Sequence, residues 1–205
     1  MVALDVKVAK RLLFEIISKI SQLVSVVDQA ALHGCLFVDV MRSLLDFCKA
    51  LDICLVIAVQ AKQEVNVTKY PVKLNQGTIV NYKLVSSETG IDRNSAADVI
   101  VNLTQHDCIE PITGEWMDAF LVQSQTFVKD RKWSKYEQPR MLCLAMMEEV
   151  GELCGVLKFV DDNEQNVSSR VYGEIVSEIC DVYIYFSRLA DLCGFFEFIK
   201  KEATA

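Results

Sequence analysis

Apolar residues recur at helical spacing along most of this chain. The first such stretch runs from Val8 to Val27, with apolar side chains at positions 12, 13, 16, 17, 20, 23 and 24. Because residues three and four apart share one face of a helix, this spacing predicts an amphipathic helix. Further helices are expected over residues 38–61, 116–130, 137–159 and 171–201. The pattern therefore predicts an all-α fold.

The helical pattern breaks between residues 70 and 113, where prolines, glycines, serines and asparagines accumulate. Such residues mark turns and loops. We expect a linker over residues 75–112, which divides the chain into an N-terminal segment, 1–74, and a C-terminal segment, 113–205. Within the linker, residues 97–103 are apolar and β-branched, so either a short strand or a turn of helix is expected there.

Composition supports a helical protein with a sizeable core. Hydrophobic residues make up 52% of the 205 positions, with only 8 Gly and 3 Pro. Few helix breakers favour long helices over a turn-rich β fold. The excess of apolar residues indicates that some of them are buried between subunits. The longest strongly apolar run, Ile53–Val59, is far too short to span a bilayer, so no membrane partner is expected.

Charge and cysteine usage narrow the class of protein further. A net charge of −7 argues against a nucleic-acid polymer as partner and suits a site that binds a polyanion through metal ions. The eight cysteines occur singly, without a Cys-x-x-Cys pair, which argues against zinc and fits a reducing, cytoplasmic compartment. Charged residues interrupt the first apolar stretch, so no signal peptide is expected.

Two acidic pairs near the C-terminus carry the candidate chemistry. Glu149 and Glu152 lie three residues apart, as do Glu178 and Asp181, so each pair shares one face of its helix. Both helices are apolar around the acids, where unpaired carboxylates are costly. Facing each other, the four would form a cage for a hard divalent cation, most commonly Mg²⁺. A solvated helix face is the alternative explanation for either pair alone.

The two ends of the chain resemble each other in hydrophobic pattern. Residues 11–23 align with residues 139–153, which places Lys19 where the second copy has an acidic residue. In an ungapped register Asp39 falls on the position of Asp181, whereas a leucine replaces the accompanying glutamate. The pattern indicates an internal duplication in which the first copy has lost its acidic clamp.

The acidic pairs and the segment around Trp133 resemble the dCTP pyrophosphatases, which belong to the MazG-like, all-α nucleoside triphosphate pyrophosphohydrolases. The superfamily signature is Glu-Glu-x-x-Glu, a spacer, then Glu-x-x-Asp. It is matched here by Glu148, Glu149, Glu152, Glu178 and Asp181. The resemblance covers about residues 115–197. It implies a tandem of two MazG-like helical repeats that form a four-helix-bundle-type pseudo-dimer.

The first half resembles the closing segment of the same family. Lys62 and Asn66, followed by Lys69-Tyr70-Pro71, match that segment. The resemblance implies that segment 1–74 has kept the tail and lost the clamp, whereas segment 113–205 has kept the clamp. One composite active site would then form between the repeats. Two chains are expected to assemble further, as a homo-oligomer such as a dimer.

The resemblance implies Mg²⁺-dependent hydrolysis of a dCTP-like nucleoside triphosphate to monophosphate and pyrophosphate. The implied metal ligands are Glu149, Glu152, Glu178 and Asp181. Either Glu148 or Glu149 would help to deprotonate the attacking water. The implied substrate-binding residues are Trp133, Phe159 and Tyr185 on the side of the base and Lys135 near the phosphates. Lys62 and Asn66 would reach either the phosphates or the metal ions from the first repeat.

Three positions depart from the pattern of the dCTP pyrophosphatases and leave the base preference open. Phe159 stands in place of a second Trp, and Ser124 and Glu137 each stand in place of a His. Another nucleotide, such as dUTP or a modified nucleotide, is therefore an alternative substrate. A non-catalytic nucleotide-binding or interaction module is the alternative to an enzyme. No Gly-x-x-x-x-Gly-Lys sequence is present, which excludes P-loop chemistry.

Overall fold

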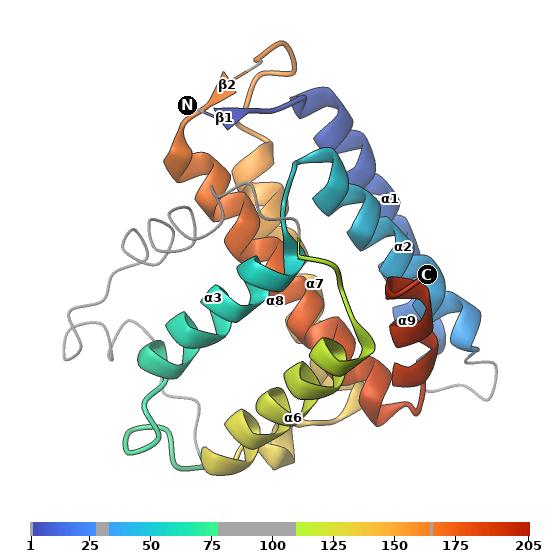
Figure 1. Ribbon diagram of the computed structural model, residues 1–205, viewed down its shortest axis with the longest axis vertical. Coiled ribbons are helices and arrows are strands. Elements are labelled where there is room, and N and C mark those ends of the chain that lie inside the picture. Colours follow the sequence, from blue (N-terminus) through green and yellow to red (C-terminus); the bar gives the residue numbers. More distant parts are fainter. Residues whose placement is uncertain (1, 28–32, 78–109, 165) are drawn as a thin grey trace.

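Seven α-helices provide almost all the regular structure within the described residues of the computed structural model, 2–27, 33–77, 110–164 and 166–205 (Figure 1). They are α1 (Val6–Val26), α2 (Gly34–Ala50), α3 (Leu55–Lys69), α6 (Gly114–Asp130), α7 (Pro139–Leu157), α8 (Ser169–Leu192) and α9 (Phe196–Ala203). A 3-10 helix, η1 (Ser134–Tyr136), precedes α7. Two short strands, β1 (Val2–Ala3) and β2 (Asn166–Val167), pair antiparallel. The prediction of an all-α protein is confirmed.

Local sequence signals explain where several helices begin. The Asp5 carboxylate accepts a hydrogen bond from the backbone N–H of Val8 at 3.0 Å and so caps α1. Thr113 and Ser168 cap α6 and α8 in the same way. Each cap satisfies a backbone donor that has no partner inside its helix. Pro139 opens α7, where a missing N–H costs nothing. Pro139 and the Ser168 cap thus define the first turns of α7 and α8, the helices that carry the acidic pairs.

Two of the expected helices are each divided by a turn, so the prediction of single helices there is wrong. Residues 38–61 belong to α2 and α3, with Asp52 at φ 54° between them. Residues 171–201 belong to α8 and α9, with Gly194 at φ 76° between them. A left-handed residue of this kind ends a helix. The apolar spacing continues through both turns, which is why the pattern alone did not reveal them.

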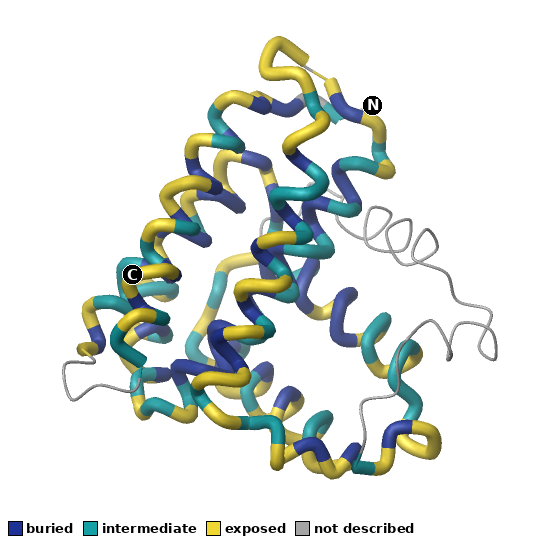
Figure 2. The backbone as a smooth tube through the Cα atoms, turned by 180° about the vertical axis from the view of Figure 1, so that it is seen from behind, coloured by how far each residue is buried: buried dark blue, intermediate teal, exposed yellow. Residues whose placement is uncertain are grey.

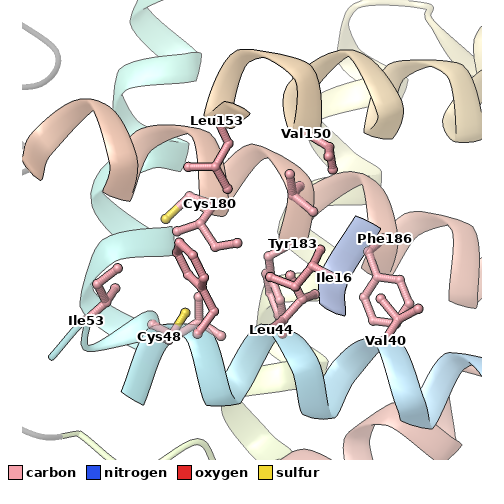
Figure 3. Packing of buried hydrophobic residues seen from close by; sticks show 14 of the residues in the cluster. Ile16, Val40, Leu44, Cys48, Ile53, Val150, Leu153, Cys180, Tyr183 and Phe186 are labelled. Atoms are coloured by element: carbon pink, nitrogen blue, oxygen red, sulfur yellow. The ribbon is translucent and has the colours of Figure 1, made fainter. Parts of the chain in front are cut away.

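Four helices enclose the main hydrophobic core. α1 packs against α2, α7 packs against α8, and the two hairpins meet through contacts of α1 with α7 and of α2 with α8. Figure 3 shows the buried side chains between them, including Ile16, Leu44, Val150, Tyr183 and Phe186. Figure 2 shows buried and exposed positions along most helices, whereas residues 171–190 of α8 are all buried or half-buried. This burial holds α7 beside α8, so that the two acidic pairs share one region of the molecule.

Two helices pack across the halves of the chain. α3, from the first half, packs against α8, and α9, from the second half, packs against α2 (Figure 1). The hydroxyl of Tyr172 on α8 donates to the backbone carbonyl of Leu51 at 3.0 Å and lies 3.3 Å from that of Asp52. These bonds attach the turn before α3 to α8. The position of α3 relative to the acidic pairs is therefore fixed by packing and by hydrogen bonds.

The linker, the absence of a membrane span and the cysteines were also predicted from the sequence. Most of the expected linker, including residues 97–103, lies outside the described residues. None of the described helices is both long and apolar enough to cross a bilayer. The seven cysteines in the described part of the chain are free thiols, in line with the scattered cysteine pattern.

Candidate functional site

A large cleft lies between the α7–α8 hairpin, α3 and α6. Its volume is about 1790 Å³. Most residues between 62 and 72 of the first half line it, together with residues from α6, α7 and α8 of the second half. All candidate site residues except Lys135 line this cleft: Lys62, Asn66, Trp133, Glu148, Glu149, Glu152, Phe159, Glu178, Asp181 and Tyr185.

Three carboxylates from two helices converge in the cleft. Glu149 and Glu152 on α7 and Glu178 on α8 have side-chain oxygens that all lie within 4.8 Å of one another. The spacing of three residues places the first two on one face of α7. The packing of α7 against α8 brings the third to the same point. All three side chains are partly buried. We call Glu149, Glu152 and Glu178 the carboxylate cluster.

Asp181, the fourth acidic candidate, contacts a lysine from the first half of the chain. The Lys62 Nζ lies 2.5 Å from the Asp181 Oδ2 and donates a hydrogen bond to the Ser177 Oγ at 2.6 Å. The side chains of Lys62 and Asp181 are only 5% and 15% exposed. The pair is thus shielded from solvent, and it connects α3 to α8.

Negative charge is concentrated around the carboxylate cluster. The pKa of Glu149 is raised from 4.5 to about 9, first by burial and then by the charges of Asp181 and Glu178. Burial also raises the pKa of Tyr185, together with the charges of Glu149 and Asp181. Burial acts to lower the pKa of Lys62, but Asp181 and Glu178 outweigh it and raise that pKa, so the ammonium stays charged. The positive charge of Lys62 alone therefore does not balance the negative charges of the acidic residues around it.

The stability of the metal-free protein is expected to fall as the pH rises from about 4.5 to about 9. Folded Glu149 holds its proton with a pKa of about 9, whereas the unfolded chain has the ordinary value of 4.5. The resulting stabilisation is complete below the unfolded pKa and is lost as the pH rises through the folded pKa. Urea unfolding in EDTA at several pH values measures this trend. A Glu149→Gln variant should show a flatter profile, and an unchanged slope would assign the trend to other groups.

Trp133 belongs to an aromatic cluster in the wall of the cleft. Its ring packs edge-on against Tyr70, with centroids 5.5 Å apart, and against Phe127, at 5.8 Å. The buried Arg131 guanidinium lies 3.6 Å from the centre of the Phe127 ring and donates to the backbone carbonyl of Tyr70 at 2.6 Å. Trp133 is 9% exposed, so it supports the wall as well as lining it. Tyr70 brings the expected tail segment onto this wall.

The remaining candidates differ in how they meet the cleft. Phe159 follows α7 and is 84% exposed. Glu148 is also exposed and lies outside the carboxylate cluster. Asn66 on α3 is partly buried. Lys135 lies on η1 and is exposed, with its Nζ 4.9 Å from the centre of the Tyr136 ring; Tyr136 lines the cleft, whereas Lys135 does not.

Three polar contacts in the cleft were not predicted as site features. Ser177 accepts a hydrogen bond from the Lys62 ammonium. Its position one helical turn before Asp181 was the only feature of the sequence that could have indicated a place in the site. Gln63 donates to the Ser124 Oγ at 3.2 Å in a buried contact between the halves. Arg188 donates through Nε to the Glu137 Oε1 at 2.8 Å. The sequence singled out Ser124 and Glu137 only as departures from relatives, since their partners are distant in sequence.

The donor set of the carboxylate cluster suits a hard divalent cation. Carboxylate oxygens are the ligands that Mg²⁺ prefers, and Mg²⁺ is often held by one or two carboxylates together with substrate phosphates. Burial is the first cause of the raised pKa of Glu149, and repulsion by the charges of Asp181 and Glu178 is the second. A divalent cation at this point would remove that repulsion. The residues present therefore fit a Mg²⁺ ion.

Comparison with known proteins identifies partial homology. Over 70 residues the chain is 39% identical to dCTP pyrophosphatase 1 of Homo sapiens and 37% identical to that of Bos taurus. Each match covers 33% of this chain and 41% of the relative, so the matched region spans less than half the length of these curated proteins. The resemblance to a MazG-like pyrophosphatase is confirmed over that part of the chain. No family model matches the sequence, and no solved structure matches it.

Proposed function

We propose that this protein is a Mg²⁺-dependent nucleoside triphosphate pyrophosphohydrolase that converts dCTP, or a related pyrimidine deoxynucleotide, to its monophosphate and pyrophosphate. The observation that carries this proposal is the convergence of Glu149, Glu152 and Glu178 in a large cleft. The partial homology to proteins named dCTP pyrophosphatase 1 supports the reaction class. The expected role is to cleanse or balance the nucleotide pool.

The acidic residues would divide between two tasks. Glu149, Glu152 and Glu178 would hold Mg²⁺, with Asp181 as a further ligand. When bound, Mg²⁺ would neutralise charge on the triphosphate oxygens. Glu148 lines the same cleft but stands apart from the carboxylate cluster. We therefore assign to it the role of accepting a proton from the attacking water, with Glu149 as the alternative base.

The cationic and aromatic residues would bind the nucleotide. Lys62 and Asn66 lie one turn apart on α3 and line the cleft, so we assign them to the phosphates. Trp133, Tyr185 and Phe159 would contact the base, since aromatic rings offer stacking surfaces. A role for Lys135 stays a prediction, because the side chain lies beside the cleft rather than in its lining.

We further propose that the chain is a tandem of two MazG-like repeats, 1–74 and 113–205, joined by the linker 75–112 and forming a pseudo-dimer. The reciprocal packing of α3 on α8 and of α9 on α2 supports this arrangement. The left-handed residues Asp52 and Gly194 end corresponding helices in the two halves. A homo-oligomer of such chains stays a prediction.

A substrate panel tests the proposed function. We expect the purified protein with MgCl₂ to release pyrophosphate from dCTP and from 5-substituted dCTP in preference to dUTP and the purine nucleotides, and EDTA to abolish the release. Preference for another nucleotide would support the proposed class of reaction but show that the proposed substrate is wrong. Nucleotide binding without turnover of any triphosphate would instead favour the non-catalytic module.

A further inference from the structure

The Lys62 ammonium and a metal ion would compete for one carboxylate. Asp181 is three residues from Glu178 on α8, yet it lies outside the carboxylate cluster, and its Oδ2 is 2.5 Å from the Lys62 Nζ. The ammonium is also bonded to Ser177 on the preceding turn. Because the lysine is buried and held by two partners, its charge sits at a defined point beside the cluster. A divalent cation that takes the Asp181 Oδ2 as a ligand would have to displace this contact.

We propose that Lys62 is an internal counter-cation that restrains the loading of free Mg²⁺ and couples metal binding to nucleotide binding. This inference rests on the proposed function, because it concerns the same site. In the metal-free protein the ammonium partly neutralises the acids and withholds Asp181. When a triphosphate enters, its oxygens offer the ammonium new partners, and Asp181 becomes available as a metal ligand. Metal and nucleotide then strengthen each other's binding, as thermodynamic coupling requires.

The geometry gives this role a physical basis in two effects. First, a positive charge next to the cluster repels a second cation, and burial keeps solvent from screening that repulsion. Second, the ammonium already occupies the Asp181 Oδ2, so a metal ion that used this oxygen would have to compete with Lys62 for it. Lys62 reaches the acids from α3, which packs directly on α8. The restraint therefore comes from a different half of the chain than the cluster itself.

The test is calorimetric titration of MgCl₂ into the full-length protein without nucleotide, with Mg²⁺-dependent thermal unfolding as a second readout. Lys62→Met keeps the length of the buried stem and removes the charge. We expect its Mg²⁺ affinity to rise by about tenfold or more, the size of effect that a nearby like charge has on an ionisable site. Lys62→Arg retains a cation and should keep the weak binding. Lys200→Met removes a lysine that pairs with Asp118 at 2.8 Å outside the cleft and should change nothing.

The outcomes separate this inference from the proposed function. Equal Mg²⁺ affinity in Lys62→Met and the unaltered protein would overturn the role of Lys62, even if pyrophosphate release is normal. No Mg²⁺ binding in either protein, together with no pyrophosphate release, would overturn the proposed function and this inference with it.

A measurement on the unaltered protein covers the case in which Lys62→Met does not fold. The NMR signal of the Lys62 side chain, assigned by its loss in Lys62→Arg, should move when MgCl₂ and a non-hydrolysable dCTP analogue are added together. It should stay in place with the same concentration of MgCl₂ alone. A full shift with MgCl₂ alone would overturn the proposed coupling.

Discussion

Replacing Glu149 by Gln is expected to lower the turnover of dCTP by about a hundredfold or more, the scale seen when a key electrostatic group is removed from an active site. The amide keeps the shape of the side chain but removes the charge that would hold the cation. Asp181→Asn is expected to have a similar effect, since it removes another proposed ligand. Steady-state pyrophosphate release at saturating Mg²⁺ measures both variants.

Glu174→Gln is the matched control for these two substitutions. Glu174 lines the same cleft on α8 but pairs with Arg170 at 3.1 Å instead of joining the carboxylate cluster. Its removal should leave turnover close to that of the unaltered protein. Because Glu149→Gln relieves repulsion among the acids, its stability in EDTA should not fall. Full activity in both Glu149→Gln and Asp181→Asn would place the chemistry elsewhere.

Arg188→Met is expected to destabilise the protein by about 3 kcal/mol, because breaking a buried ion pair leaves a charge without its partner. The Arg188 side chain is 5% exposed. It donates to the Glu137 Oε1 at 2.8 Å through Nε and to the Asp191 Oδ2 at 3.2 Å through Nη1. Methionine fills most of the space but leaves both carboxylates uncompensated in a poorly solvated position. Urea unfolding at neutral pH gives the change in the free energy of unfolding.

Arg42→Met is the surface counterpart of this experiment. Arg42 binds Glu202 with an Nε–Oε1 distance of 2.5 Å, but its side chain is 58% exposed. Exposed pairs contribute little, so a much smaller loss than in Arg188→Met is expected. The two variants remove the same kind of group from the same kind of partner and differ mainly in burial. Equal losses would contradict the view that burial decides the effect.

The helices and the carboxylate cluster could be anticipated because both depend on short spacings. The repeat of apolar residues located the helical stretches, and a spacing of three placed Glu149 beside Glu152. The apolar surroundings of both acidic pairs indicated buried carboxylates, and the packing of α7 against α8 in the structure brings Glu178 to the same point. Such local patterns can be interpreted from the sequence because the helix itself determines which residues three and four apart share a face.

The contacts that complete the cleft could not be located from the sequence because they join distant positions. Lys62 and Ser177 are 115 residues apart, and Arg188 and Glu137 are 51 residues apart. Such pairs depend on how α3, α8 and the segment around Trp133 pack. The turn at Asp52 was missed for a different reason. Its left-handed conformation depends on backbone hydrogen bonds, and apolar residues on both sides continue the helical spacing.

The packing of α3 on α8 has a consequence for how the protein works at low abundance. Lys62 and Asp181 belong to one polypeptide, so they meet by an intramolecular encounter at an effective concentration that does not change on dilution. A residue drawn from a separate subunit would be lost once the concentration fell below the dissociation constant of the assembly. Each molecule therefore carries both sides of its own cleft, however few copies a cell contains.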